Sequence, residues 1–248
     1  MNNALYVGLS RQMTLKREMD VIANNIANSD TTGFKVESIM LREDVEQPTL
    51  KASAGSSPPE KITFVHDAGV ARDFAQGPLR QTGGTFDLGL TGDGFFQVQT
   101  ANGNRLTRDG RFNTNAQGQL VDKTGNPVLS NGGQPIRLDP TKSAPQIAHD
   151  GTISQDGVIA GKVGVFSVPD RNALGKEGGG LFDPTGQTPV ADPKTTIQQG
   201  MIENANVDAI QQMTRMIAVS RAYEQVSNMM NETSQTSDES IQRLGKVN

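Results

Sequence analysis

Two long heptad patterns lie at opposite ends of the chain, and they constrain the fold more than any other feature. Over residues 3–28 and again from Val207 to Leu244, apolar or small residues recur in steps of three and four without an intervening proline. This period is typical of amphipathic helices that pack on other helices. Because each apolar face needs a cover, we predict that the two terminal helices pair as a coiled-coil-like core, with part of each face left for neighbouring subunits.

The first helix is expected to end in an unusual amide-rich stretch, residues 23–35. Asn24, Asn25 and Asn28 are mediocre helix formers that prefer to bond the backbone. Gly33 can adopt the positive φ that terminates a helix, and Phe34 then offers an apolar anchor. Taken alone, such a stretch is also what an ordinary helix C-terminus looks like.

The middle of the chain has a different period. Phe86, Leu88 and Leu90 alternate with polar or small residues, which is typical of a half-buried strand. Turn dipeptides then recur between residues 102 and 157, among them Asn102-Gly103 and Asp156-Gly157. Such dipeptides favour tight hairpins, so residues 85–169 are predicted to form an antiparallel sandwich or small barrel.

Segments rich in glycine and proline flank this β region. Residues 47–60 and 170–195 are predicted to be exposed loops, and 196–206 an extended return segment. The predicted fold class is therefore α+β, with long N- and C-terminal helices pairing as a coiled-coil-like core and an inserted all-β, hairpin-rich domain. The predicted divisions are an N-terminal core helix (1–34), an extended linker region (35–80), a β domain (81–195), a return segment (196–206) and a C-terminal core helix (207–248).

Composition excludes several classes of function. Only 34% of the 248 residues are hydrophobic, which suggests a thin core and an elongated molecule with surface buried against other chains. The net charge of −4 gives no basic field for nucleic acid, and the absence of cysteine excludes a disulfide framework and thiolate metal sites. We expect neither a transmembrane helix nor a cleaved secretory signal peptide.

No residues with a catalytic, cofactor-binding or metal-binding pattern are predicted. His66 and His149 lack partners at ligand spacing. Gly92-Asp93-Gly94 precedes a strand pattern, whereas a phosphate-binding loop precedes a helix. The arginines at 105, 108 and 111, close to Asp109, indicate a solvated hairpin.

Three groups of motifs resemble those of the flagellar axial proteins, the family of rod, hook and hook-associated subunits. The first is A-N-N-I-A-N-x-x-T-x-G-F-K at 23–35. The second joins Gly92-Asp93-Gly94-Phe95-Phe96 to Thr107-Arg108-Asp109-Gly110-Arg111-Phe112 and the downstream Gly118-Gln119-Leu120-Val121. The third runs from Gly200-Met201-Ile202-Glu203-Asn204-Ala205-Asn206-Val207 to Arg221-Ala222-Tyr223-Glu224, with alanine at 205 where the family usually has serine.

The resemblance implies a structural subunit of the bacterial flagellar basal-body rod, most similar to a proximal-rod subunit. It implies partners among its own copies, other rod proteins and the flagellar export apparatus. It also implies a place in the rod that spans the periplasm, reached by type III export. The open alternatives are a distal-rod subunit and a ligand-binding β domain on a helical stalk. The residues predicted to form the assembly interface are Leu5, Leu15, Met19, Ile22, Asn25, Ile26, Asn28, Gly33, Phe34, Asn206, Val207, Met213, Met216, Ile217, Tyr223 and Met230.

Overall fold

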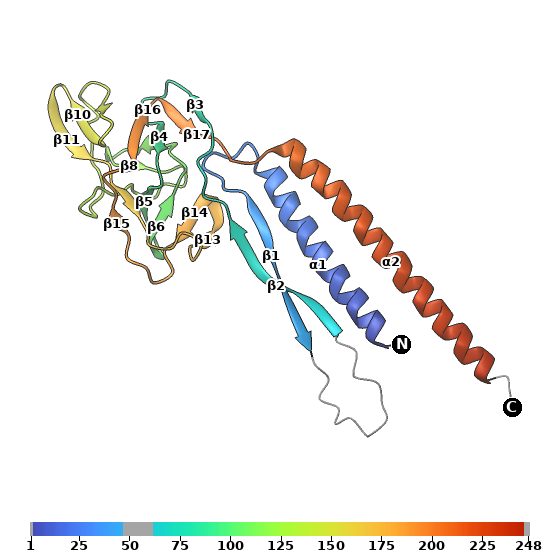
Figure 1. Cartoon of the computed structure of the whole chain (residues 1–248). Helices are drawn as coiled ribbons and strands as arrows, with labels where there is room; N and C mark the ends of the chain where they lie inside the picture. The colour runs from blue at the N-terminus through green and yellow to red at the C-terminus, as the bar shows by residue number, and fades with distance from the viewer. Residues whose placement is uncertain (1, 47–61, 246–248) are drawn as a thin grey trace. The chain divides into compact units, whose positions relative to one another are not determined.

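The computed structural model describes residues 2–46 and 62–245, which form two compact units (Figure 1). The helical unit is drawn from Met1–Ala27, Glu37–Ala71 and Asp208–Asn248, and the β unit from Asn28–Val36 and Arg72–Val207. The chain therefore passes between the units four times. Each unit is described by itself below.

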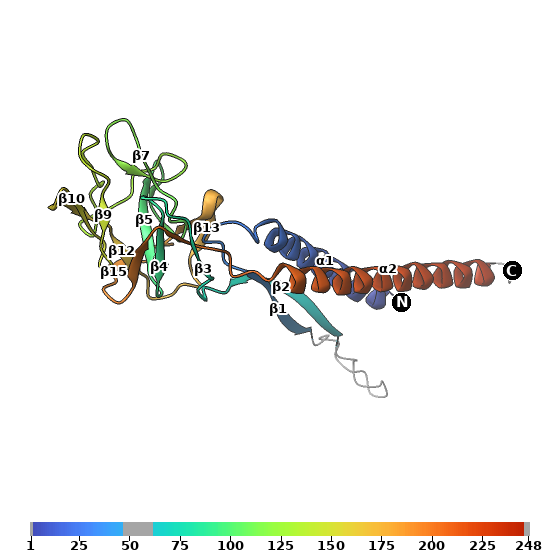
Figure 2. The same cartoon turned by 90° about the horizontal axis from the view of Figure 1, so that it is seen from above.

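The helical unit contains two long helices and a two-stranded sheet. Helix α1 covers Asn2–Ala27 and helix α2 covers Ala209–Gly245, and the sheet consists of β1 (Glu37–Glu46) and β2 (Ile62–Arg72). Figures 1 and 2 both show α1 and α2 lying side by side. Asp208 caps α2, because its Oδ1 accepts hydrogen bonds from the backbone N–H groups of Ile210 and Gln211 at 3.0 and 3.1 Å. Within the described residues, neither helix is long and apolar enough to cross a bilayer.

The helices meet over only part of their length. The buried centre of the contact is Leu15, Ile22 and Val219. Half-buried side chains from both helices pack around it: Met19, Ile26, Met216, Ala222, Tyr223 and Val226.

The prediction of a coiled-coil-like core is therefore wrong. What the chain has is two helices that approach each other from Asn25 and Gln212 to Gly8 and Met230, but whose buried apolar contact is confined to a few side chains, with a large β-rich unit between them in sequence. Met213, a seam position in the heptad pattern, is 51% exposed. The physical reason lies in the seam itself, since glycine, glutamine and several serines stand where a coiled coil needs large apolar knobs.

The β unit is built from small antiparallel sheets. The largest has six strands, in the order β13 (Gly175–Glu177), β14 (Leu181–Asp183), β6 (Gly103–Thr107), β5 (Phe95–Thr100), β12 (Val165–Ser167) and β15 (Val190–Ala191). A three-stranded sheet has the order β11 (Val158–Lys162), β10 (Thr152–Gln155) and β9 (Gln146–Ile147). Three strand pairs complete the unit: β16 (Thr196–Gln199) with β4 (Leu88–Thr91), β17 (Met201–Glu203) with β3 (Leu79–Gln81), and β7 (Asn113–Thr114) with β8 (Leu120–Val121).

Two apolar clusters form the core of the β unit. The larger gathers side chains from many short strands, including Leu88, Phe96, Val128, Ile153 and Ile197. The smaller is aromatic: the rings of Phe74, Phe95 and Phe182 meet edge to face with centroids 5.6–6.0 Å apart. The return of the chain through β16 and β17 means that residues near 200 complete a core begun near residue 88.

Residues 170–195 depart from their prediction as a long surface loop. They contain β13, β14 and β15 as well as the short 3-10 helix η1 (Gly178–Gly180), and Phe182 from this segment is buried in the aromatic cluster. The glycines and prolines there separate short strands. The loop predicted at 47–60 and the side chain of His66 lie outside the described residues.

The β10–β11 hairpin allows a matched test of the β unit's core. Ile153 on β10 is fully buried, whereas Ile159 on β11 is 72% exposed. We expect Ile153→Ala to lower the free energy of unfolding by about 2–5 kcal/mol because it leaves a cavity. Ile159→Ala should change it by no more than about 0.5 kcal/mol. Urea unfolding of the purified protein measures both, and equal effects would contradict the assigned register.

Candidate assembly interface

Within the helical unit, Asn25 joins three segments. Its Nδ2 donates to the carbonyl of Glu37 at 2.7 Å, and its Oδ1 accepts from the N–H of the same residue at 2.9 Å. Nδ2 also lies 3.3 Å from Oε1 of Gln212 on α2. The side-chain amide thus pairs with the start of β1 as a backbone peptide would, which explains a buried asparagine near the end of a helix.

The predicted interface residues on the two helices fall into two groups. Leu15, Met19, Ile22, Ile26, Met216 and Tyr223 lie in the contact between α1 and α2 of the same chain. Met213 and Ile217 are more than half exposed. Met230 is half-buried and approaches α1 at Gly8, where an added Cβ would lie 2.9 Å from Cγ of Met230. The side chain of Leu5 lies outside the described residues.

Within the β unit, three charged side chains form a buried ionic cluster: Lys35, Arg108 and Glu203. Nζ of Lys35 lies 2.6 Å from Oε1 of Glu203, and an Nη atom of Arg108 lies 3.1 Å from Oε2. All three side chains are at most 1% exposed. One carboxylate thus pairs with two cations away from solvent, which leaves the cluster with a formal charge of +1.

Backbone groups complete the shell around the Lys35–Glu203 pair. Lys35 donates from Nζ to the carbonyl of Ala75 at 2.7 Å, and the N–H of Gly77 donates to Oε1 of Glu203 at 2.9 Å. Burial lowers the pKa of Lys35 below its ordinary value, and the charge of Glu203 opposes that shift.

The guanidinium group of Arg108 makes two further contacts. It donates to the carbonyl of Gly92 at 2.8 Å, and its guanidinium carbon lies 5.0 Å from the centre of the Phe95 ring. Burial lowers its pKa, again against the opposing charge of Glu203. Its buried Nε finds no hydrogen-bond acceptor among the described residues. The interpretation of this arginine as part of a solvated hairpin was therefore wrong, and Arg105 and Asp109 are also largely buried.

Gly33 and Phe34 lead the chain into this cluster. The N–H of Gly33 donates to the carbonyl of Glu203 at 2.7 Å, at a φ of +70°. A Cβ added there would lie 2.5 Å from the carbonyl carbon of Arg108, so only glycine fits. The Phe34 ring is buried, with Nζ of Lys176 4.9 Å from its centre.

Asn206 acts within the β unit as Asn25 acts within the helical unit. Its Oδ1 accepts from the N–H of Val36 at 2.7 Å, and its Nδ2 donates to the carbonyls of Asp73 and Ala75 at 2.8 and 3.0 Å. It therefore ties together the segments that precede β1, follow β2 and precede α2.

Two further predicted interface residues are partly covered within the β unit. Val207 is half-buried. Asn28 is half-buried too, and accepts hydrogen bonds from the N–H and the hydroxyl of Thr31 at 3.0 and 3.2 Å. The set as a whole stays a prediction: the structure buries much of it within single units and leaves Met213 and Ile217 on the surface.

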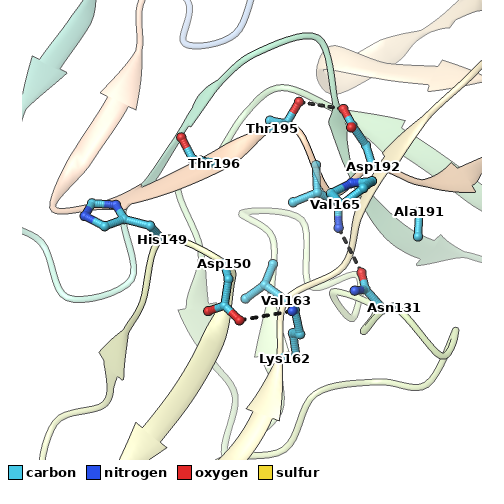
Figure 3. Close-up of a pocket in the computed structure, with 11 residues that line it drawn as sticks. Asn131, His149, Asp150, Lys162, Val163, Val165, Ala191, Asp192, Thr195 and Thr196 are labelled. Atoms are coloured by element: carbon cyan, nitrogen blue, oxygen red, sulfur yellow. Dashed lines mark hydrogen bonds and ion pairs between the residues drawn. The ribbon is translucent and has the colours of Figure 1, made fainter.

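A cavity of about 430 Å³ lies in the β unit between the β10–β11 hairpin and β15 (Figure 3). Several of its polar groups are paired within the protein: Asp150 pairs with Lys162, Asp192 accepts from Thr195, and Nδ1 of His149 lies 3.0 Å from the carbonyl of Ile197. Hydrogen bonds from Thr152, with the ion pair to Lys162, hold the pKa of Asp150 at about 2. Within the described residues no group of histidines and carboxylates could hold a metal ion.

Three segments of the chain match models of known protein families, and each of these segments contributes one residue to the ionic cluster. Residues 5–35 match the family described as flagella basal body rod protein, and 198–243 match the C-terminal family of flagellar basal body rod FlgEFG proteins. Residues 89–160 match the D1 domain of the flagellar hook protein FlgE/F/G family. The chain is 48% identical to the flagellar basal-body rod protein FlgF of Caulobacter vibrioides, with all of both chains aligned.

Other relatives point the same way. Identity is 36% with the FlgF protein of Mesorhizobium japonicum over 99% of both chains, and 29% with the FlgG protein of Bacillus subtilis over 98% of both. The chain therefore belongs to the family of flagellar basal-body rod proteins. Within this family it is FlgF-like, since its identity to these FlgF relatives exceeds its identity to the FlgG relative.

The ionic cluster was missed by the sequence prediction, although a signal for it was present. Each of the three motif groups carries one of its members: Lys35 ends the first, Arg108 lies in the second and Glu203 in the third. Charged residues inside otherwise apolar or glycine-rich motifs are unusual on a surface strand, and their opposite signs suggest a buried partner.

Removal of the shared carboxylate tests the cluster. We expect Glu203→Gln to lower the free energy of unfolding by about 3–5 kcal/mol, because two buried cations lose their counter-charge. The matched control is Glu177→Gln. Glu177 is partly exposed, and its partner Arg105 also pairs with Asp183, so this substitution should lower the free energy of unfolding by no more than about 1 kcal/mol. Chemical denaturation measures both, and similar losses would contradict the assigned burial.

A second pair of variants separates backbone strain from steric clash. Gly33 and Gly83 have nearly the same φ, +70° and +72°, but a Cβ at Gly83 would meet nothing within 4 Å. Gly83→Ala should therefore show only the cost of the left-handed backbone, about 1–2 kcal/mol. Gly33→Ala should lose about 1–3 kcal/mol more, because the added methyl overlaps the backbone of Arg108. Thermal unfolding of the two variants measures the difference.

Proposed function

We propose that this chain is a structural subunit of the proximal part of the flagellar rod. In this role its copies join relatives in a helical tube that transmits torque and encloses the export channel. Membership of the basal-body rod family and the higher identity to FlgF relatives support the assignment. The observation that carries it is the apolar surface left on both helices of the helical unit, at Tyr6, Leu9, Met13, Ile210, Met213 and Ile217.

The proposed partners are other copies of the chain, other rod proteins and the flagellar export apparatus. The proposed location is the rod within the periplasm, reached by type III export. Large apolar side chains exposed on a helix face favour burial against another chain. Its part there is mechanical rather than catalytic, which agrees with the internally paired polar groups of the cavity in Figure 3.

Among the sequence alternatives, a distal-rod role is less favoured by the lower identity to the FlgG relative. A ligand-binding role for the β unit would need polar groups that are free to meet a ligand. Four charged or polar side chains of the cavity lining instead pair with one another, Asp150 with Lys162 and Asp192 with Thr195.

An exposed position on α2 tests the structural role. Ile217 is 56% exposed, so Ile217→Asp should leave the fold intact while placing a charge in the proposed contact. We expect loss of rod incorporation and of motility in cells that carry only this variant. The control is Ala218→Asp on the exposed neighbouring face. Electron microscopy of basal bodies and a swimming assay measure the outcome, and normal motility of Ile217→Asp would count against the proposal.

A second prediction concerns the free subunit. Few large apolar side chains are buried between α1 and α2, so we expect the turns beyond them to form fully only on assembly. Circular dichroism of the dilute monomer should therefore show less helix than residues 2–27 and 209–245 would give together. A spectrum with the full helix content would contradict coupled folding and assembly.

A further inference from the structure

Two asparagine–glycine dipeptides lie in turns of the β unit, Asn102-Gly103 and Asn131-Gly132. In such a pair the backbone nitrogen of the glycine can attack the side-chain amide of the asparagine, because glycine carries no side chain that hinders the approach. The two dipeptides share this chemistry in sequence, but the structure gives them different surroundings. Neither has a part in the proposed rod function.

Asn131-Gly132 occupies the centre of an open turn. The N–H of Gly133 donates to the carbonyl of Ser130 at 2.9 Å and closes this turn. Among the described residues, the N–H of Gly132 donates to no acceptor. A Cβ added to Gly132 would meet only Oγ of Ser130, at 3.8 Å, and one added to Gly133 would meet nothing within 4 Å. The peptide nitrogen of Gly132 is therefore unheld, and it has room to turn towards the side chain of Asn131.

The side-chain amide of Asn131 is positioned for such an attack. Its Oδ1 accepts a hydrogen bond from the N–H of Val165 at 3.2 Å (Figure 3). Attack at Cγ moves negative charge onto this oxygen, and a backbone N–H directed at it stabilises that charge as the donors of an oxyanion hole do. The side chain of Asn131 is exposed, so water reaches the product of the attack.

Asn102-Gly103 is held more firmly. Gly103 is the first residue of β6 and pairs with Thr100 of β5 in the sheet. Oγ1 of Thr100 accepts from the N–H of Asn102 at 3.2 Å and donates to the carbonyl of Gly103 at 2.7 Å. Rotation of the peptide between Asn102 and Gly103 would therefore break contacts at the end of a strand pair.

We propose that Asn131 is a site of spontaneous deamidation, and that the fold of the β unit directs the reaction to Asn131 instead of Asn102. The backbone nitrogen of Gly132 forms a bond to Cγ of Asn131, and the bond from Cγ to Nδ2 breaks. The proton of the Gly132 nitrogen passes through solvent to Nδ2, which leaves as ammonia. The product is a cyclic imide that contains the nitrogen of residue 132.

Water then opens the imide at one of its two carbonyl carbons. Addition at Cγ gives aspartate in an ordinary main chain. Addition at the backbone carbonyl carbon of residue 131 gives isoaspartate, in which the main chain runs through Cγ. The two products have the same mass and differ in the length of the main chain.

Either product changes the wall of the cavity in Figure 3. A carboxylate replaces the neutral amide of Asn131 in a lining that already carries Asp150 and Asp192, and like charges in one cavity repel each other. Isoaspartate also adds a bond to the turn and displaces the oxygen that accepts from Val165, the first residue of β12. An aged chain should therefore be more acidic at this cavity and less well held at the start of β12.

Peptide mapping of stored protein tests the proposal. Trypsin separates the two asparagines, because Arg105 and Lys123 lie between them. In purified full-length protein kept at neutral pH, we expect conversion at least several-fold faster at Asn131 than at Asn102. An isoaspartate-specific methyltransferase should label the Asn131 peptide. Asn126 shares this peptide but precedes proline, whose nitrogen has no proton and cannot form the imide.

Two controls separate the fold from the sequence. In guanidinium chloride the two asparagines should convert at similar rates, because only the dipeptides remain. Gly132→Val should lower conversion at Asn131 several-fold and leave Asn102 unchanged, since a β-branched side chain hinders the attack. Gly132 has no positive φ and open space around it, so this variant should keep the fold, which thermal unfolding checks.

Four results would overturn the proposal. Equal conversion at the two asparagines of the folded protein would remove the role of the fold, and so would a preference for Asn131 that persists unchanged in guanidinium chloride. Conversion of Asn131 without any isoaspartate, or conversion undiminished in Gly132→Val, would exclude the imide route.

Discussion

The β unit depends on one carboxylate shared between two buried cations. Glu203 pairs with both Lys35 and Arg108, and the three residues come from segments separated by more than seventy positions at each step. Each ion would be costly to bury alone, so the arrangement is acceptable only when all three segments are in place. Apolar contacts would tolerate small slips between these segments, whereas a fixed set of charged hydrogen bonds defines a single arrangement. The cluster therefore contributes specificity to a unit whose individual sheets are small.

Two asparagines of the terminal motifs, Asn25 and Asn206, fix the segments in which the chain passes between the units. Asn25 joins the end of α1 to the start of β1 and to α2 on the helical side. Asn206 joins the residues before β1, after β2 and before α2 on the β side. An amide suits both places because it donates and accepts at once, as a peptide group does. Each unit thus holds the segments that enter and leave it through the side-chain amide of one asparagine. These hydrogen bonds within the chain explain the two asparagines without any contact with another subunit.

Periodicity located both helices to within about two residues, because apolar residues spaced by three and four over such lengths are typical of helices and not of strands or loops. Periodicity did not predict how the two helices pack on each other. A heptad count treats glycine, glutamine and serine positions as part of a seam. These residues supply no large apolar side chain, so the buried apolar contact between the helices is small.

Turn dipeptides gave the hairpin-rich character of residues 85–169, since a positive φ is a local requirement that the sequence states directly. The strands at 170–195 were not predicted, because they are two or three residues long and pair with strands distant in sequence. The ionic cluster escaped notice for the same reason. The motifs single out Lys35 and Arg108 as charges, but only the fold shows that Glu203 lies between them. The residues proposed to meet other subunits stay a prediction, because a single chain reveals exposure and not its neighbour.

The order of the cluster's members along the chain has a consequence for when the β unit can fold during synthesis. A polypeptide that emerges amino end first presents Lys35 early, Arg108 midway and Glu203 only when about four-fifths of its length has appeared. Until Glu203 is present, Lys35 and Arg108 repel each other, and both charges are more stable in water than buried. The β unit can therefore complete this cluster only after most of the chain is present.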